Sequence, residues 1–152
     1  MTLYELLLAL HILAVATWFG SGLAITVMGI RALKTGVAPF SSFTVNATEW
    51  AGRAHPAAGV LLLVTGIWMV SEAGISFGEP WVVIALAGLF AAMGVGGALT
   101  GRTSAGLVER IAANGGILPE SERPAADRLL LYSRIELAII ALVIFDMVAK
   151  PS

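Results

Sequence analysis

The sequence predicts an all-α fold, a transmembrane antiparallel four-helix bundle, and two observations carry this prediction. Of the 152 residues, 58% are hydrophobic and only 12% are charged, whereas about 25% of the residues of a soluble domain are charged. Four stretches are also apolar over about 20 residues, the length that crosses a bilayer. We therefore expect one integral membrane domain, residues 1–152, with the lipid bilayer as its main partner and spans at about residues 5–30, 54–71, 80–100 and 129–149.

Composition excludes several classes of function. The formal net charge of −1 provides no basic surface for nucleic acid. The absence of cysteine excludes disulfides, iron–sulfur clusters and thiolate metal sites. No HExxH motif is present, so nothing points to the metalloprotease chemistry of that motif. The sequence names no substrate and no reaction, and a role other than an enzyme is favoured.

The first span is the clearest. Residues 6–30 carry no charge, and their one strongly polar member is His11. No Lys or Arg precedes Arg31, and the apolar run is longer than the hydrophobic part of a signal peptide. We therefore expect this segment to be retained as a membrane span.

The second span needs residues from upstream, because the apolar run from Pro56 to Val70 is short. Asn46 and Glu49 have the spacing of a capping box, with Asn replacing the usual Ser or Thr. This pattern predicts a long helix that begins near Asn46 and kinks at Pro56.

The third and fourth spans differ in polarity. Pro80 is suited to a first helical position and Gly101 to a stop. The segment after Gly101 is expected to extend the helix, turn at Asn114–Gly116 and enter the last helix near Pro124. The fourth span is interrupted by Arg134 and Glu136.

The basic residues predict the orientation. The loop after span 1 contains Arg31, Lys34 and Arg53, and the loop after span 3 contains Arg102, Arg110, Arg123 and Arg128. The loop between spans 2 and 3 contains none. The positive-inside rule then places both basic loops in the cytoplasm and both termini outside.

Small residues are frequent inside the spans. Gly88, Ala92 and Gly96 recur at intervals of four, and Gly22 and Gly29 share one face of the first span. Small residues allow close helix packing in lipid, where no hydrophobic force drives association. Interior packing is the favoured interpretation; a groove for a flat ligand, a partner helix or a second copy of the chain is the alternative.

Ionisable residues inside the spans predict two polar layers. The intramembrane polar cluster would contain Arg53, His55, Arg134 and Glu136, and the outer polar layer would contain His11, Asp146 and Trp68. We expect Glu136 to pair with Arg53 or His55, and Arg134 with Glu49 or with the cytoplasmic interface, because an unpaired charge in lipid costs several kcal/mol. A structural clamp is favoured over a proton or ion pathway.

The two histidines raise the question of a haem. At about 1.5 Å per residue, their depths differ by about 15 Å, so they cannot ligate one iron together. Haem b held by His11, alone or with another sixth ligand, stays open. The alternative is a buried His11 that is hydrogen-bonded to Asp146 or to a backbone carbonyl. Whether another metal is bound is left undetermined.

Three segments of the chain are similar to known membrane proteins. They are Leu10 to Gly22, which has the pattern LH…W.G.G, and the later segments Thr65–Trp68 and Ser133–Glu136. The chain resembles an uncharacterised bacterial family of small predicted integral membrane proteins. It is more distantly similar to copper-resistance protein D and to membrane protoporphyrinogen-oxidase-like proteins. The resemblance implies a multi-pass protein of the bacterial inner membrane and makes His11 a candidate functional or haem-contacting position. The third-helix lysine of the oxidase-like proteins has no counterpart here.

Three functions follow as hypotheses. The first is a non-enzymatic accessory or assembly component that oligomerises or docks other membrane proteins. The second is a haem- or metal-binding redox protein with His11 as axial ligand. The third is a small proton- or ion-coupled transporter that uses Glu136.

Overall fold

The computed structural model describes residues 2–150, and these residues form an all-helical structure, as predicted. The helices make four long rods. Rod 1 is α1 (Leu3–Val15), the π-helical segment η1 (Ala16–Gly20) and α2 (Ser21–Thr35). Rod 2 is α3 (Val37–Glu72). Rod 3 is α4 (Pro80–Gly94), the π-helical segment η2 (Val95–Gly101) and α5 (Arg102–Ala113). A short 3₁₀ turn, η3 (Glu120–Glu122), leads into rod 4, which is α6 (Arg123–Ala149).

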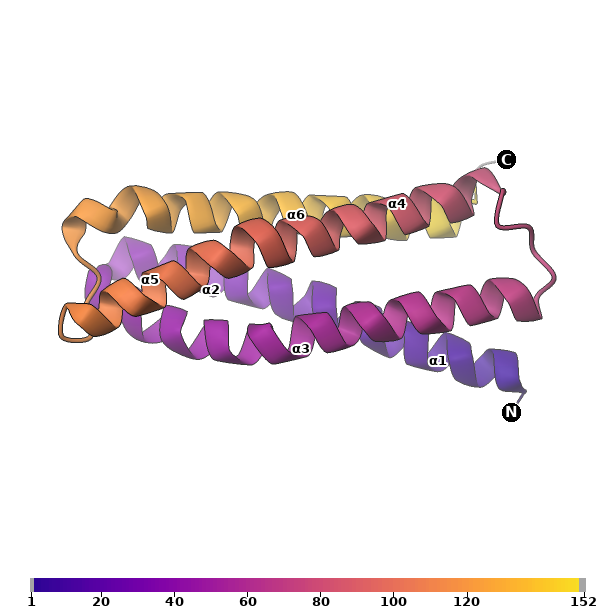
Figure 1. Cartoon of the computed structure of the whole chain (residues 1–152), viewed down its shortest axis with the longest axis horizontal. Helices are drawn as coiled ribbons and strands as arrows, with labels where there is room; N and C mark the ends of the chain where they lie inside the picture. Colours follow the sequence, from indigo (N-terminus) through magenta and orange to yellow (C-terminus); the bar gives the residue numbers. More distant parts are fainter. Residues whose placement is uncertain (1, 151–152) are drawn as a thin grey trace.

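The four rods lie along one long axis, and the chain reverses direction between successive rods (Figure 1). The beginning of α1 and the end of α6 lie at the same end of the molecule, which we call the open end. The other end holds the beginning of α3, the end of α5 and the beginning of α6, and we call it the closed end.

The start of rod 1 is fixed by a capping box that the sequence reasoning did not identify. The hydroxyl of Thr2 accepts a hydrogen bond from the backbone N–H of Glu5 (3.2 Å). The carboxylate of Glu5 accepts one from the backbone N–H of Thr2 (2.9 Å). Two of the free N–H groups of the first turn are thereby satisfied.

The start of rod 2 corrects a prediction. The capping box expected at Asn46 and Glu49 is wrong, because α3 begins at Val37 and Asn46 lies inside it, donating its side-chain amide to the carbonyl of Ser42 (2.9 Å). Gly36 separates α2 from α3 with φ of 151°, a conformation that a residue with a Cβ rarely adopts. One glycine thus reverses the chain, and the helix starts directly after it.

Rods 3 and 4 follow the predicted course, except that Gly101 does not stop the helix: η2 runs to Gly101 and α5 continues directly from Arg102. α5 continues rod 3 as far as Ala113, and the chain turns at Gly115 and Gly116, both with positive φ. α6 then begins at Arg123 with Pro124 in its first turn. The loop between the two rods is anchored by Leu118, whose N–H donates to the hydroxyl of Ser41 in α3 (2.8 Å).

The described part of the chain contains three helical rods that are long and apolar enough to cross a membrane: Leu3–Thr35, Val37–Glu72 and Pro80–Ala113. Rod 4 does not reach the same apolarity, since Arg134, Glu136 and Asp146 lie within it. Large apolar side chains nevertheless face outward on every rod. Leu13, Val60, Phe90 and Phe145 are examples.

Buried apolar side chains form two core clusters inside the bundle. One core cluster lies at the closed end; it contains Leu33, Phe40, Leu107, Ile111, Leu118, Ala125, Ala126, Leu129 and Leu130. The second surrounds Trp18 and contains Ala14, Ala58, Leu62, Ala92 and Ile140. Toward the open end α1 packs on α3 and α4 packs on α6. Space is left between these two pairs of helices.

Candidate functional site: two cavities separated by Trp18

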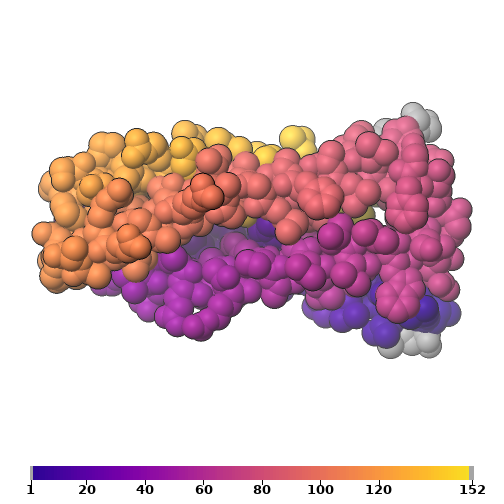
Figure 2. Space-filling model, in the orientation of Figure 1, coloured from indigo at the N-terminus to yellow at the C-terminus, as the bar shows by residue number. Residues whose placement is uncertain are grey.

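Two cavities, each of about 570 Å³, lie inside the bundle. The outer cavity is at the open end between α1, α3, α4 and α6, and it contains His11. The inner cavity lies toward the closed end and contains His55 and Glu136. Trp18 and Ile140 line both cavities and so form the partition between them. In the space-filling view, a hollow lies between α3 and rod 3 (Figure 2).

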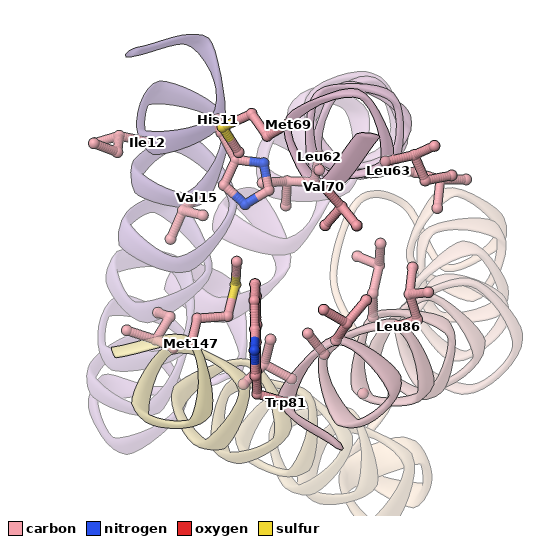
Figure 3. A pocket seen from close by; sticks show the side chains of 18 of the residues that line it. His11, Ile12, Val15, Leu62, Leu63, Met69, Val70, Trp81, Leu86 and Met147 are labelled. Carbon is pink, nitrogen blue, oxygen red and sulfur yellow. The ribbon is translucent and has the colours of Figure 1, made fainter. Parts of the chain in front are cut away.

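The outer cavity presents one nitrogen of His11. The Nδ1 atom of His11 lies 2.8 Å from the hydroxyl oxygen of Thr65. That hydroxyl also lies 2.6 Å from the carbonyl of Leu61, and donation to this carbonyl leaves its oxygen to accept the N–H of Nδ1. In this tautomer Nε2 has a free lone pair. Figure 3 shows this second nitrogen pointing into the cavity.

The position of the His11 ring depends on a glycine. A Cβ atom on Gly66 would lie 3.4 Å from Cε1 of the ring, so the absence of a side chain lets the imidazole lie close against α3. The ring and its hydrogen-bond partner Thr65 are both buried. His11 is thus held in one orientation by α3 and turned toward the space beyond it.

The wall that faces His11 comes from α4 and α6. Met147 and Trp81 lie across the cavity from the imidazole (Figure 3). At the open end, Lys150 lines the cavity and its Nζ atom lies 5.5 Å from the centre of the Trp81 ring. The cavity therefore has an apolar body, one histidine nitrogen on its wall and one cation at its rim.

Trp18 holds the partition in place. Its side chain is 3% exposed, and its Nε1–H donates to Oε1 of Glu136 (2.8 Å). The indole lies against α3, where a Cβ on Gly59 would come within 3.1 Å of the ring. Trp18 therefore connects α1, α3 and α6 at the level where the two cavities meet.

Glu136 is 5% exposed and has two partners, both neutral. The first is Trp18, and the second is the hydroxyl of Thr100, 3.4 Å from Oε2. Trp18 lies in η1 and Thr100 in η2, so both π-helical segments direct a donor at the same carboxyl group. Short π-helical segments within α-helices occur frequently at functional sites.

The inner cavity holds two further polar groups. Nε2 of His55 lies 3.1 Å from the hydroxyl of Ser21, and its ring makes an edge contact with Trp50. Thr26 is 4% exposed, and its hydroxyl has no hydrogen-bond partner among the described residues. A buried hydroxyl without a partner costs about 1–3 kcal/mol, and this one lies in the lining of the cavity.

The predicted intramembrane cluster does not form as one unit. Arg53 pairs with Glu49 (3.2 Å) one helical turn away, and both side chains are mostly exposed. Arg134 is exposed as well. The partners expected for Glu136 are therefore wrong, because Trp18 and Thr100 bond to it, and so is the pairing of Arg134 with Glu49, which pairs with Arg53 instead. The physical reason is proximity, since residues four apart on one helix are neighbours.

The predicted outer layer is also rearranged. His11 bonds to Thr65 rather than to Asp146 or a backbone carbonyl. Trp68 is 48% exposed and does not line the cavity. One carboxylate oxygen of Asp146 is buried without a partner among the described residues. His11 is the member of the predicted layer that lines the outer cavity.

Sequence reasoning missed the neutral polar residues. Thr65 orients His11, Thr100 bonds to Glu136, and Thr26 lines the inner cavity. The one feature of the sequence that could have identified these residues is the presence of hydroxyl groups inside otherwise apolar spans. A helical threonine can bond to its own backbone, so the sequence does not tell which of them face the interior.

Few side chains in this part of the structure are arranged to bind a metal ion directly. Residues 2–150 contain no group of three or more His, Cys, Asp or Glu side chains that could hold one. A single imidazole suits a cofactor that brings its other ligands with it, as the porphyrin of a haem does.

Comparison with known proteins gives one family. Residues 5–151 match a family described as "Predicted integral membrane protein (DUF2269)". No curated protein and no solved structure matches. The similarity to copper-resistance protein D and to the oxidase-like proteins therefore stays a prediction.

Proposed function

The chain belongs to this family of predicted integral membrane proteins, and from that premise we propose a four-span membrane protein that binds haem b in its outer cavity through His11. The single observation that carries the proposal is the free Nε2 of His11, fixed by Thr65 and turned into an apolar cavity of about 570 Å³. Cavities of about 300–1,000 Å³ are the usual size for a bound organic ligand or cofactor.

The donor set supports a haem in particular. A metal-ligating histidine usually donates its other ring N–H to a neighbouring oxygen, which fixes the ring and raises its basicity, and Thr65 supplies that oxygen. Met147 on the facing wall carries a thioether, the second ligand type that cytochromes use. Lys150 at the rim suits the carboxylate groups of a haem. When bound, haem supplies one-electron chemistry.

The helix faces that carry glycine favour a ligand-binding role over the docking of a partner helix. A Cβ on Gly22, Gly29 or Gly88 would meet Leu137, Leu130 or Val143 of α6. These faces are thus used for packing within the chain, as the favoured interpretation expected. These three glycines are therefore not free to receive a partner helix.

Absorption spectroscopy tests the haem. We expect protein purified in mild detergent from haem-supplied cells to show a Soret band, and His11→Ala to lose it because no other imidazole lines the outer cavity. His55→Ala is the matched control and should keep the band, since His55 lies beyond Trp18. Met147→Leu should keep the haem with an altered spectrum. A colourless wild-type protein, or loss of the band in His55→Ala alone, would reject the proposal.

The membrane orientation is part of the same proposal. We place all four rods across the bacterial inner membrane in antiparallel order, with the closed end in the cytoplasm, because the helix segments toward that end carry most of the Lys and Arg residues. Alkaline phosphatase fused to the C-terminus should therefore be active, and a fluorescent protein that matures only in the cytoplasm should be dark there. The opposite pair of results would invert the orientation.

A further inference from the structure

We propose that the inner cavity is a binding site for a lipophilic organic cation, with Glu136 as its counter-charge. This site is separate from the haem site, because the partition formed by Trp18 lies between the two cavities. The proposal does not depend on haem binding. It is built from the charge of Glu136, the aromatic walls of the cavity and one unpartnered hydroxyl.

Glu136 has no positive partner in the described part of the chain. Its two hydrogen-bond donors, Trp18 and Thr100, are neutral. Arg53 is engaged with Glu49, and the pairing found for Arg110 is with Glu122 at the closed end. A buried carboxylate needs a compensating positive charge. In this cavity, either a proton or a cationic ligand can supply it.

The walls of the inner cavity suit an organic cation rather than a hydrated metal ion. The rings of Trp18, Phe40, Phe43 and His55 line it, and aromatic faces attract cations within about 6 Å of the ring centre. Most of the remaining lining is aliphatic or glycine. The ligand body must therefore be apolar, and its charge must sit beside the carboxylate.

Thr26 provides a second and independent indication of a ligand. Its side chain is more than nine-tenths buried, lines the cavity and has no hydrogen-bond partner among residues 2–150. The hydroxyl oxygen of Thr26 is thus an acceptor for an N–H of a protonated amine bound in this cavity. The natural ligand class we infer is therefore a lipophilic amine in its cationic form.

The test compares two probes of the same shape and opposite charge. Tetraphenylphosphonium and tetraphenylborate are measured by equilibrium dialysis against purified full-length protein in a nonionic detergent, with protein-free micelles subtracted. We expect the phosphonium to bind saturably and the borate not to bind.

Three variants identify the site. Glu136→Gln keeps oxygen and nitrogen atoms for Trp18 and Thr100 but removes the charge, and should weaken phosphonium binding about tenfold or more. Glu49→Gln, which alters an exposed carboxylate, should bind as the wild type does. Thr26→Val, which removes the unpartnered hydroxyl, should weaken the binding of a protonated alkylamine more than that of phosphonium, which has no N–H to donate.

Two results would overturn the proposal: equal binding of the two probes by the wild-type protein, or wild-type phosphonium affinity in Glu136→Gln. The comparison of the probes needs no variant, so it decides the matter even if Glu136→Gln fails to fold. His11→Ala should bind phosphonium normally, because it alters only the outer cavity. Failure of the haem proposal and failure of the cation proposal are therefore distinguishable.

Discussion

Replacing Trp18 with alanine is expected to lower the free energy of unfolding by about 3–5 kcal/mol, the usual cost of removing a buried Trp. The side chain is almost fully buried and forms the partition between two cavities. Its removal would join these cavities and leave Oε1 of Glu136 without its donor. Denaturant titration of the purified protein in detergent, followed by circular dichroism, measures the change.

Two further variants separate the causes. Trp18→Phe keeps an aromatic ring but removes the N–H, and should cost about 1–3 kcal/mol, the cost of leaving a buried polar group unsatisfied. Trp50→Ala truncates a tryptophan that is 48% exposed, and should cost much less than Trp18→Ala. If Trp18→Ala and Trp50→Ala were equally stable, Trp18 would have no special structural role.

The second large effect is expected at Gly88. A Cβ on Gly88 would collide with Cγ2 of Val143. Val143 is β-branched and has little freedom to rotate within α6. We therefore expect Gly88→Ala to separate α4 from α6 and to cost about 1–3 kcal/mol, even though alanine favours a helix over glycine. Thermal unfolding in detergent measures it.

A rescue experiment makes this prediction specific. Val143→Ala removes the atom that would collide, so the double variant Gly88→Ala with Val143→Ala should be more stable than the sum of the two single changes indicates. Gly94→Ala is the matched control on the same helix, because a Cβ there would meet nothing within 4 Å. A destabilised Gly94→Ala, or no rescue in the double variant, would contradict the packing of α4 on α6.

Much of the fold could be predicted from local signals. The course of rods 3 and 4 followed from Pro80, from the glycines at 115 and 116 and from Pro124, because each of these residues acts on its own segment of backbone. The start of α3 was predicted wrongly at Asn46, because a residue with capping chemistry can equally bond within a helix. Gly36 sets the true start of α3, but it forms no capping pattern with the residues around it.

The candidate site was predicted only in part. His11 stood out as the lone polar group of the first span, and it does line a cavity. Glu136 was expected in a charged cluster, but its partners are an indole and a hydroxyl. Charge indicates which residues need partners in lipid, whereas the choice among partners depends on which atoms come within hydrogen-bond distance.

The sequence by itself determined that this chain is helical, apolar and reversed at defined glycines and prolines, because composition and local backbone preferences act within each segment. Only the tertiary structure decided how each rod is rotated about its axis. The spans are apolar around most of their circumference, so hydropathy does not indicate which face is interior. Close contacts at residues such as Gly59, Gly66 and Gly88 set that rotation. They thereby place Trp18 between the cavities, turn His11 into the outer one and bury Glu136 beside the inner one.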